Sequence, residues 1–454
     1  MSGFAGMRVL VVGLGASGAA AARVLHRLDA KVRVTEASSG ADVDRRAREL
    51  RDAGVEVEVG GHDLDAIDAD LAIVSPGIPP TSQIVEALRS ARIETIGEVE
   101  LAFRLARCDF LAITGTNGKT TTTSLLATML EEAGIPSVAA GNIGLPAVEA
   151  VGLVPRGGAI ALEVSSFQLA TIERFHPRVA VVLNVAEDHT DWHGSFASYA
   201  AAKERISENQ GADDVFVFNA LDDEARRMAS RTRARTVPFS IAEAPPDGIG
   251  VQDGEVFWRG RSIFSASDVA LPGVAGLEDS LAAAAAALSY GVDVRPVVRG
   301  IKGFRALRHR LEIVAEIDGV TFIDDSKATN PHAAIAAAQG LHDVVLIAGG
   351  RAKGIDLSVM RTMVPPVSAV VALGEAADEI ARAFEGAAPV EHASDMEDAV
   401  RRAAARSRRG GSVLLAPGCA SLDMYTDYAA RGEAFVRAVK TLVDRQERSA
   451  GGES

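Results

Sequence analysis

The stretch of sequence that decides the fold is residues 111–121, which read Leu111-Ala112-Ile113-Thr114-Gly115-Thr116-Asn117-Gly118-Lys119-Thr120-Thr121. An apolar strand leads into a glycine loop and then into a helical segment, which is the order found in phosphate-binding loops. Glycines let backbone N–H groups close on phosphate oxygens, Lys119 can reach the β and γ phosphates, and Thr120 is placed to hold Mg²⁺. The residue six before Lys119 is Ile113 rather than glycine, so the spacing departs from the general P-loop. A glycine turn with a chance Lys-Thr pair is the plainer alternative, but the strand and helix context favours a bound nucleotide.

Elsewhere along the chain, short runs of Val, Ile, Leu and Ala alternate with longer helical segments. This pattern predicts parallel sheets covered by helices, so the fold class is α/β with at least two sheets. Residues 238–264 instead show short alternating runs with turn signals, which predicts a hairpin insertion. The expected strands are residues 8–12, 31–35, 71–74, 110–114, 159–163, 179–184, 215–219, 320–324, 344–348, 369–373 and 412–416.

The length of 454 residues is too great for one hydrophobic core. Glycine-rich turns after residues 12 and 113 each look like the start of a separate ligand-binding unit. A third series of strands and helices begins near residue 306. We predict a Rossmann-like N-terminal domain over residues 1–98, a central domain with a P-loop ATPase-like parallel sheet over residues 99–305, and a Rossmann-like C-terminal domain over residues 306–454.

The first of these turns satisfies the dinucleotide-binding fingerprint, because it reads Gly13-Leu14-Gly15-Ala16-Ser17-Gly18. Glu36 ends the following strand, about 20 residues on, where a ribose-binding acid is expected. An NAD dehydrogenase is therefore a serious rival interpretation. The same helix N-terminus can equally bind the diphosphate of a UDP-sugar. The later phosphate loop, which a dehydrogenase does not need, favours the second interpretation.

Charge and cysteine content restrict the partners and the compartment. The formal net charge of -14 argues against a nucleic-acid or anionic-membrane partner, because such surfaces recruit an excess of Lys and Arg. Only Cys108 and Cys419 are present, which is typical of a reducing compartment and predicts a cytoplasmic location. We expect no signal peptide and no apolar run long enough to cross a bilayer.

Polar residues also follow two further predicted strands. Glu163 ends one strand, His189 lies in the turn after the next, and Lys203 lies on the helix that follows. Carboxylates with an imidazole suit a divalent ion beside phosphate. Taken singly, each group is explained as well by a strand-end cap or a solvated turn. Their recurrence after successive strands favours a metal site.

Together these motifs resemble the Mur ligases, and the resemblance runs nearly from end to end. The segments that carry it are residues 115–121, 141–144, 163–169, 184–189, 199–203, 309–310, 325–330 and 417–423. The segment 325–330 with 421–423 is most similar to the members that add D-glutamate. The resemblance implies an ATP-dependent ligase that joins D-glutamate to UDP-N-acetylmuramoyl-L-alanine through an acyl phosphate in peptidoglycan precursor synthesis. It also implies a monomer.

The resemblance further implies roles for individual residues. ATP would be bound by Gly115, Thr116, Asn117, Gly118, Lys119, Thr120, Thr121, Arg310 and Asp325, and two Mg²⁺ ions by Thr120, Glu163, His189 and Lys203. Lys119, His189 and Lys203 would serve catalysis. The UDP-muramoyl substrate would lie against Gly15, Ala16, Ser17, Glu36, Ser75, Pro76, Gly77, Asn142 and Ser165, and D-glutamate against Lys327, Thr329, Lys353, Ser421 and Leu422. Tyr428 would be a further substrate-binding residue, at a position where the family often has Phe.

Lys203 needs a modification for this role. A lysine is cationic as encoded, so it binds a metal only as a carbamate, N6-carboxylysine. A direct contact with phosphate is the plainer alternative for Lys203. For His189, service as general base for the amine is a weaker alternative to metal binding.

One segment departs from the family pattern of Gly-x-His-Asn-x-x-Asn, because Glu278, Asp279 and Ala282 replace the His and the two Asn residues. The loss of an amide either weakens nucleotide binding or is covered by another residue. Two other functions are disfavoured. The related ligase that extends folate starts directly at the ATP loop, whereas a long segment precedes the loop here. A regulatory nucleotide-binding protein need not retain His189 and Lys203.

Overall fold

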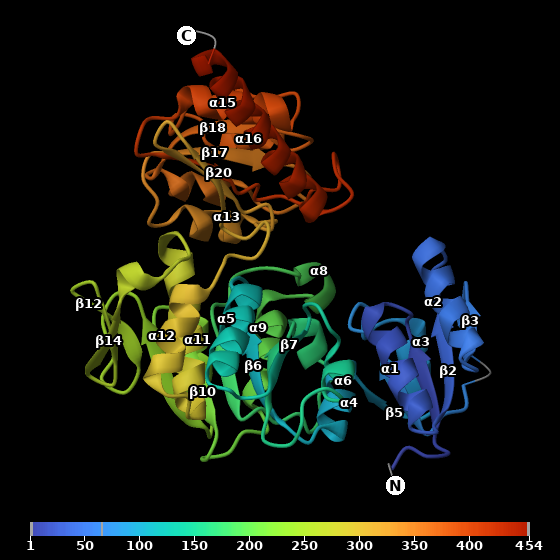
Figure 1. Cartoon of the computed structure of the whole chain (residues 1–454). Helices are drawn as coiled ribbons and strands as arrows, with labels where there is room; N and C mark the ends of the chain where they lie inside the picture. Colours follow the sequence, from blue (N-terminus) through green and yellow to red (C-terminus); the bar gives the residue numbers. More distant parts are fainter. Residues whose placement is uncertain (1–2, 65–66, 452–454) are drawn as a thin grey trace. The chain divides into compact units, whose positions relative to one another are not determined.

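The computed structural model describes residues 3–64 and 67–451, so the outermost ends of the first and third predicted domains lie outside the described residues. Three sheets follow one another along the chain (Figure 1), and the predicted α/β class with three successive domains is confirmed. The boundaries at residues 98 and 305 stay predictions. Most of the first two sheets belong to one compact unit and the third sheet to another, and each unit is described by itself.

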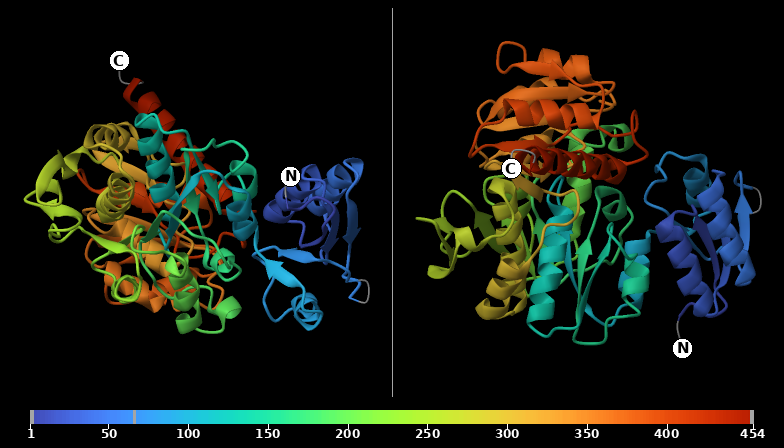
Figure 2. Two further views of the ribbon diagram at one scale, coloured as in Figure 1. Left: turned by 90° about the horizontal axis from the view of Figure 1, so that it is seen from below. Right: turned by 45° about the horizontal axis from the view of Figure 1, so that its top comes forward.

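The first sheet contains β1 (Arg8–Val12), β2 (Lys31–Glu36), β3 (Glu56–Val59), β4 (Leu71–Val74) and β5 (Glu94–Ile96). All are parallel, in the order β3-β2-β1-β4-β5. Its helices are α1 (Ala16–Arg27), α2 (Ala41–Asp52) and α3 (Gln83–Ser90). Alternate residues of β1 face opposite ways, because Val9 and Val11 share a core with α1, whereas Leu10 and Val12 share one with α3. Both faces of the sheet are therefore covered (Figure 2).

The second sheet has the order β14-β13-β12-β11-β10-β9-β6-β8-β7. These strands are β6 (Asp109–Thr114), β7 (Ser137–Gly141), β8 (Ala159–Glu163), β9 (Val179–Val182), β10 (Val215–Asn219), β11 (Arg235–Ser240), β12 (Ile249–Gln252), β13 (Glu255–Trp258) and β14 (Arg261–Ser265). The strand β6 lies between β8 and β9 and is parallel to both, so three carboxyl ends meet at one edge. This edge positions the phosphate loop.

The helices and 3-10 turns after β5 are α4 (Glu98–Leu105), α5 (Lys119–Glu132), α6 (Ala147–Ala150), α7 (Ser166–Leu169), α8 (Thr190–His193), α9 (Phe196–Glu204), η1 (Arg205–Ser207), α10 (Asp223–Ala229), η2 (Ala266–Asp268), α11 (Gly273–Tyr290) and α12 (Val294–Gly303). The predicted hairpin insertion is partly wrong, because residues 238–240 belong to β11, which pairs in parallel with β10. The tight turn between β12 and β13 has positive φ at both Asp253 and Gly254, which suits a two-residue hairpin turn.

The third sheet contains β15 (Glu312–Ile317), β16 (Val320–Asp324), β17 (Val344–Gly349), β18 (Val367–Leu373), β19 (Val390–His392) and β20 (Ser412–Leu415), in the order β15-β16-β20-β17-β18-β19. Only the edge pair β15 and β16 is antiparallel among the described pairs. Two separate cores lie on its two faces. Its helices are α13 (Pro331–Ala338), η3 (Ser358–Met363), α14 (Ala377–Ala383), α15 (Met396–Arg406) and α16 (Tyr428–Gly451).

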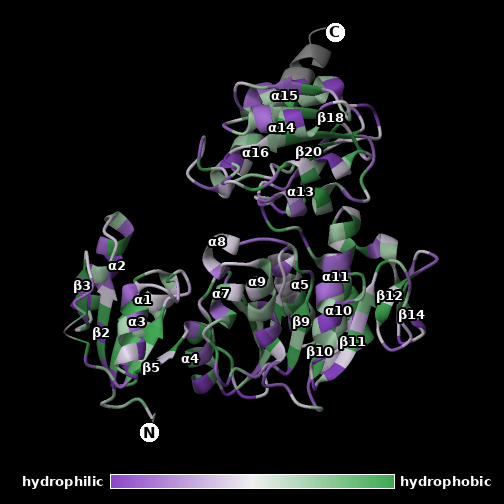
Figure 3. Cartoon of the chain, turned by 180° about the vertical axis from the view of Figure 1, so that it is seen from behind, coloured by the Kyte–Doolittle hydropathy of each residue, from purple (hydrophilic) through white to green (hydrophobic). Residues whose placement is uncertain are grey.

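Figure 3 shows mostly hydrophobic strands inside the sheets and hydrophilic residues on the outer helices and loops, as expected for helices packed on a sheet through one face. Among the described residues, no helix is both long and apolar enough to cross a membrane.

Candidate active site

The phosphate loop joins β6 to α5 where the carboxyl ends of β6, β8 and β9 meet. Gly118 adopts φ 82°, a left-handed conformation that turns the chain into the first helical turn. A Cβ at Gly115 would lie 2.9 Å from the Cβ of Leu183, so this glycine lets the loop pass close to the end of β9. A helix N-terminus directs its first N–H groups outward, which favours an anion at this end of α5.

Asn184, just beyond β9, braces this loop. Its side-chain oxygen accepts hydrogen bonds from the backbone N–H groups of Thr116 at 3.2 Å and Asn117 at 2.9 Å. Its amide nitrogen donates to the carbonyl of Asn117 at 3.3 Å, and its own carbonyl accepts from the N–H of Thr116 at 2.8 Å. Asn184 was not among the predicted site residues. A polar residue directly after a strand that neighbours β6 was the available signal.

Thr120, Glu163 and Asn142 form one hydrogen-bonded group beside the loop. The Thr120 hydroxyl donates to one carboxylate oxygen of Glu163 at 2.6 Å, and the Asn142 amide donates to the other at 2.7 Å. Glu163 is only 2% exposed. A hydroxyl and a carboxylate side by side are hard oxygen donors of the kind that Mg²⁺ prefers, so these residues fit the implied ion.

Two lysine ammonium groups converge on one carbonyl. Lys119 donates to the carbonyl oxygens of Gly115 at 2.9 Å and Thr116 at 2.7 Å, and Lys203 donates to that of Gly115 at 2.7 Å. Lys203 is 1% exposed. Burial lowers the pKa of Lys203 well below its ordinary value, and the charge of Lys119 lowers it further, although Asp188 and Glu163 oppose the shift. A neutral amine is the form that reacts with carbon dioxide, so Lys203 fits carbamate formation.

His189 lies at the rim of this group. It has φ 52° before α8, and its ring contacts Phe167 at a centroid distance of 4.8 Å. Its ring is also 6.3 Å from that of Tyr199, whose hydroxyl bonds the Thr116 hydroxyl at 3.0 Å. The side chain of His189 is 47% exposed. The structure therefore joins Lys119, Thr120, Glu163 and Lys203 closely and connects His189 to them through aromatic contacts.

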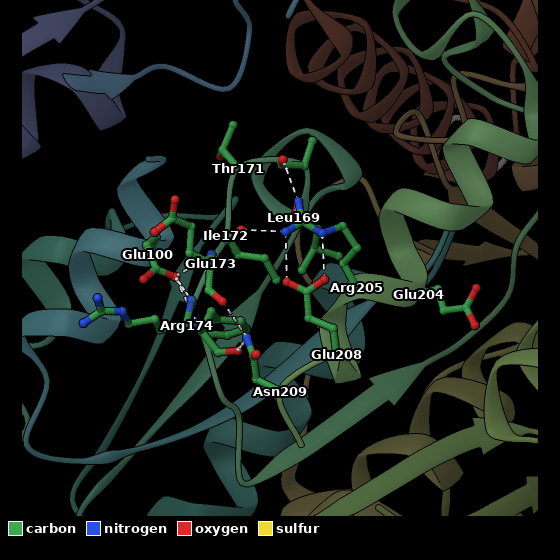
Figure 4. Close-up of polar contacts among 12 residues, drawn as sticks. Glu100, Leu169, Thr171, Ile172, Glu173, Arg174, Glu204, Arg205, Glu208 and Asn209 are labelled. Atoms are coloured by element: carbon green, nitrogen blue, oxygen red, sulfur yellow. Dashed lines mark hydrogen bonds and ion pairs between the residues drawn. The ribbon is translucent and has the colours of Figure 1, made fainter. Parts of the chain in front are cut away.

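Two charged side chains, Arg205 and Glu100, bind the backbone at and after the end of α7 (Figure 4). Arg205, two residues after Lys203, donates to the carbonyl oxygens of Leu169, Ala170 and Ile172. The fully buried Glu100 accepts the N–H groups of residues 173–175, each at 2.9 Å. The segment 169–175 follows α7, which is capped by the predicted substrate residue Ser165. The two charged side chains therefore fix both Lys203 and the α7 region.

The predicted UDP-binding residues line one cavity of the first sheet. This cavity has a volume of about 600 Å³, and its walls include Gly15, Ala16, Ser17, Glu36, Ser75, Pro76 and Gly77. The Glu36 carboxylate accepts the N–H groups of Leu14 at 2.6 Å and Ser38 at 2.8 Å, so it also braces the glycine turn. His62 was missed: it lines the cavity and bonds the Thr35 hydroxyl at 2.7 Å.

Most predicted residues of the C-terminal domain lie on the loops that follow β16, β17 and β20, whereas Arg310 precedes β15 and Tyr428 begins α16. Burial raises the pKa of Asp325 to about 7, although the charge of Arg310 opposes the shift. The Lys327 ammonium lies 4.1 Å from the ring centre of Tyr428, a cation–π contact. Thr329 is held beside Lys327 by a tight turn, in which the N–H of Thr329 donates to the carbonyl of Lys327 at 2.7 Å. Ser421 is buried, whereas Lys353 and Leu422 are exposed.

His309, Glu312 and Asp324 form a group of the size that can hold a metal ion. The three bond one another instead: the His309 ring bonds Asp324 at 2.7 Å, and the His309 N–H donates to Glu312 at 2.8 Å. This group fixes the backbone before Arg310. The segment that differs from the family pattern lies on α11, where Asp279 is mostly buried and Ala282 is fully buried.

Three family descriptions match successive parts of the chain. "Mur ligase MurD-like, N-terminal domain" matches residues 7–97, "Mur ligase middle domain" matches residues 113–287, and "Mur ligase, glutamate ligase domain" matches residues 309–419. The chain therefore belongs to the Mur ligase family.

Individual relatives match over nearly the whole length. A UDP-N-acetylmuramoylalanine--D-glutamate ligase of Frankia casuarinae is 44% identical over 96% of this chain and 94% of its own. The enzyme of the same name from Geobacillus kaustophilus is 40% identical, over 96% and 98%.

Solved structures share the fold. The MurF ligase of Thermotoga maritima in complex with ADP has a TM-score of 0.60 at 16% identity and covers 91% of this chain and 95% of its own. The UDP-N-acetylmuramate-alanine ligase MurC of the same organism has a TM-score of 0.59 at 19% identity, over 96% and 99%.

Proposed function

We propose that this chain joins D-glutamate to UDP-N-acetylmuramoyl-L-alanine at the expense of ATP. The observation that carries the proposal is the match along almost the whole chain to relatives named for this reaction. The site supports it, because a phosphate loop, an oxygen-donor pair and a buried lysine lie together at the carboxyl ends of parallel strands.

The chemistry needs no protein nucleophile. The carboxylate of the substrate's L-alanine attacks the γ-phosphate of ATP, which gives an acyl phosphate and releases ADP. The amine of D-glutamate then attacks the acyl carbon, phosphate leaves, and the amine loses a proton as the amide forms. Catalysis therefore rests on position and on charge stabilisation.

The residues divide this work. Lys119 would exchange the carbonyl oxygens of Gly115 and Thr116 for phosphate oxygens, and Asn184 would hold the loop in shape. Thr120, Glu163 and a carbamate on Lys203 would hold Mg²⁺, with His189 nearby. Bound Mg²⁺ would neutralise the charge of the transferring phosphoryl group. The UDP group would occupy the cavity of the first sheet, and D-glutamate the loops around Lys327 and Ser421.

Location and assembly belong to the same proposal. Cys108 and Cys419 are free thiols, which agrees with the reducing compartment expected from the sequence. We propose a cytoplasmic monomer, which cell fractionation and light scattering would test.

The experiment for the reaction is phosphate release from ATP and Mg²⁺ with UDP-N-acetylmuramoyl-L-alanine. D-glutamate, L-glutamate, L-alanine and diaminopimelate are offered in parallel. Release with D-glutamate alone supports the proposal. Release with a different amino acid keeps the ligase chemistry but contradicts the specificity, and no release with any of them contradicts the proposal as a whole.

A further inference from the structure

Arg431 is a buried cation that has no ion-pair partner among the residues that the structure describes. It lies near the start of α16 and is 2% exposed. Burial lowers the pKa of Arg431 to about 10, so the group stays protonated at neutral pH. The carboxylates of Asp423 and Asp324 act on its charge without forming an ion pair with it: Asp423 accepts the N–H of Glu375 at 2.9 Å, and Asp324 is engaged by His309 and by the N–H of Ser326. The guanidinium therefore acts through uncharged acceptors.

These acceptors belong to three separate loops. Arg431 donates to the hydroxyl of Ser326 at 3.0 Å and to its carbonyl at 2.8 Å. It also donates to the carbonyl oxygens of Cys419 at 3.0 Å and Gly349 at 3.4 Å. Ser326 precedes Lys327, Cys419 lies two residues before Ser421, and Gly349 begins the loop that carries Lys353. One side chain thus holds all three loops that carry the predicted D-glutamate residues.

The same loops are also tied to one another. The N–H of Arg351 donates to the carbonyl of Ala420 at 2.7 Å, and the N–H of Ala420 returns a bond to the carbonyl of Arg351 at 3.1 Å. Gly350 is needed at this crossing, because a Cβ there would lie 2.3 Å from the Ala420 carbonyl oxygen and 3.1 Å from the Arg431 guanidinium. The hydroxyl of Ser326 also donates to the carbonyl of Tyr428, at the start of the same helix.

An arginine suits this junction for a geometric reason. Its guanidinium offers five N–H donors in a rigid plane, so it reaches acceptors on several sides at once, whereas a lysine offers one ammonium group on a flexible stem. A buried carbonyl that loses its donor is costly, so loss of the guanidinium fork weakens the hold on all three loops at once.

We propose that Arg431 is the positioning residue of the amino-acid site: it sets the spacing of the loops that carry Lys327, Lys353 and Ser421 and thereby determines the affinity for D-glutamate. The inference rests on the proposed function, because it takes these loops as the D-glutamate site. Arg431 does not touch substrate. It acts through the backbone of its neighbours.

The test compares Arg431→Met, Arg431→Lys and the matched control Arg437→Met, which removes an exposed arginine from the same helix. Steady-state kinetics give KM for D-glutamate and for ATP. The first half-reaction is measured separately, by reductive trapping of the acyl phosphate in the absence of D-glutamate. Hydrogen exchange of residues 326–330, 349–354 and 417–422 reports loop order without any need for turnover.

Arg431→Met is expected to raise KM for D-glutamate at least tenfold and to speed hydrogen exchange in the three loops, while acyl-phosphate formation and KM for ATP change less than threefold. Arg431→Lys should recover part of the affinity, and Arg437→Met should match the wild type. An unchanged KM for D-glutamate, or equal losses in both half-reactions, would overturn the inference. Exchange that stays unchanged in the loops would do so too.

The wild-type protein in the same assay keeps the two proposals apart. If it turns over with a different amino acid, KM for that amino acid takes the place of KM for D-glutamate, and only the specificity in the proposed function is lost. If it does not turn over at all, the proposed function fails, and hydrogen exchange alone decides whether Arg431 orders the loops.

Discussion

Replacement of Asn184 by alanine tests whether this side chain shapes the phosphate loop. The change removes the bond from the N–H of Asn117 at 2.9 Å and two longer contacts at 3.2 and 3.3 Å, whereas the backbone bond between Asn184 and Thr116 at 2.8 Å remains. One good hydrogen bond and two weak ones correspond to about 1–2 kcal/mol. If ATP binds only the ordered loop, KM for ATP should rise roughly five- to thirty-fold.

The assay is steady-state phosphate release with ATP varied, together with thermal unfolding of each variant. Asn219→Ala is the matched control: Asn219 ends the neighbouring strand β10, and its side chain accepts the N–H of Leu221 at 2.9 Å. It should lose stability to a similar extent without a change in KM for ATP. The reasoning is refuted if Asn184→Ala binds ATP within twofold of the wild type, or if Asn219→Ala weakens ATP binding equally.

Three further predictions concern single side chains. Lys203→Arg should lower kcat by roughly 10²-fold or more, because a guanidinium cannot form a carbamate; ¹³C NMR with labelled bicarbonate should show a carbamate signal in the wild type alone, and its absence there would contradict the modification. Burial raises the pKa of Glu98 from 4.5 to about 7. Between these two pH values the folded protein keeps the proton on Glu98, whereas the unfolded chain loses it. The free energy of unfolding of the wild type therefore falls by roughly 3 kcal/mol as the pH rises from about 4.5 to about 7. Glu98→Gln should therefore unfold at a higher temperature than the wild type at pH 8 but not below about pH 4.5, and a difference independent of pH would count against this account. Asp279→Asn restores an amide of the family pattern and should lower KM for ATP about two- to ten-fold; an unchanged KM would mean that adenine is bound by other residues.

Most strands found from the sequence are buried on both faces. Residues 9–12, 159–162 and 344–348 are continuous apolar runs, and all lie in sheet interiors. The omitted strands β3, β5, β7, β15 and β19 are edge strands. Edge strands are short or partly exposed, so their sequences, such as Glu56-Val57-Glu58-Val59, carry no uninterrupted apolar signal. The omitted interior strand β11 contains Pro238, which argues against a strand in the sequence.

The candidate site also contains residues that could be predicted from the sequence and residues that could not. The phosphate loop and Glu163 could be predicted from spacing along the chain and from a strand end, and Lys203 from the family resemblance. The contacts of His62 and Arg431 depend on which loops meet in three dimensions, and no local pattern contains that information, whereas the position of Asn184 directly after a strand was a signal that could have been used. The depressed pKa of Lys203 likewise depends on its burial beside Lys119, which the sequence does not record.

The cavity of the first sheet has an evolutionary consequence. All of its walls come from residues 13–84, which belong to one five-stranded sheet and its loops. Under the proposed function, a lineage can therefore change the carrier group that it recognises by mutation within this segment alone, while the residues that activate the carboxylate stay unchanged. In this arrangement, recognition of the carrier group and formation of the amide bond at the other end of the precursor can evolve separately.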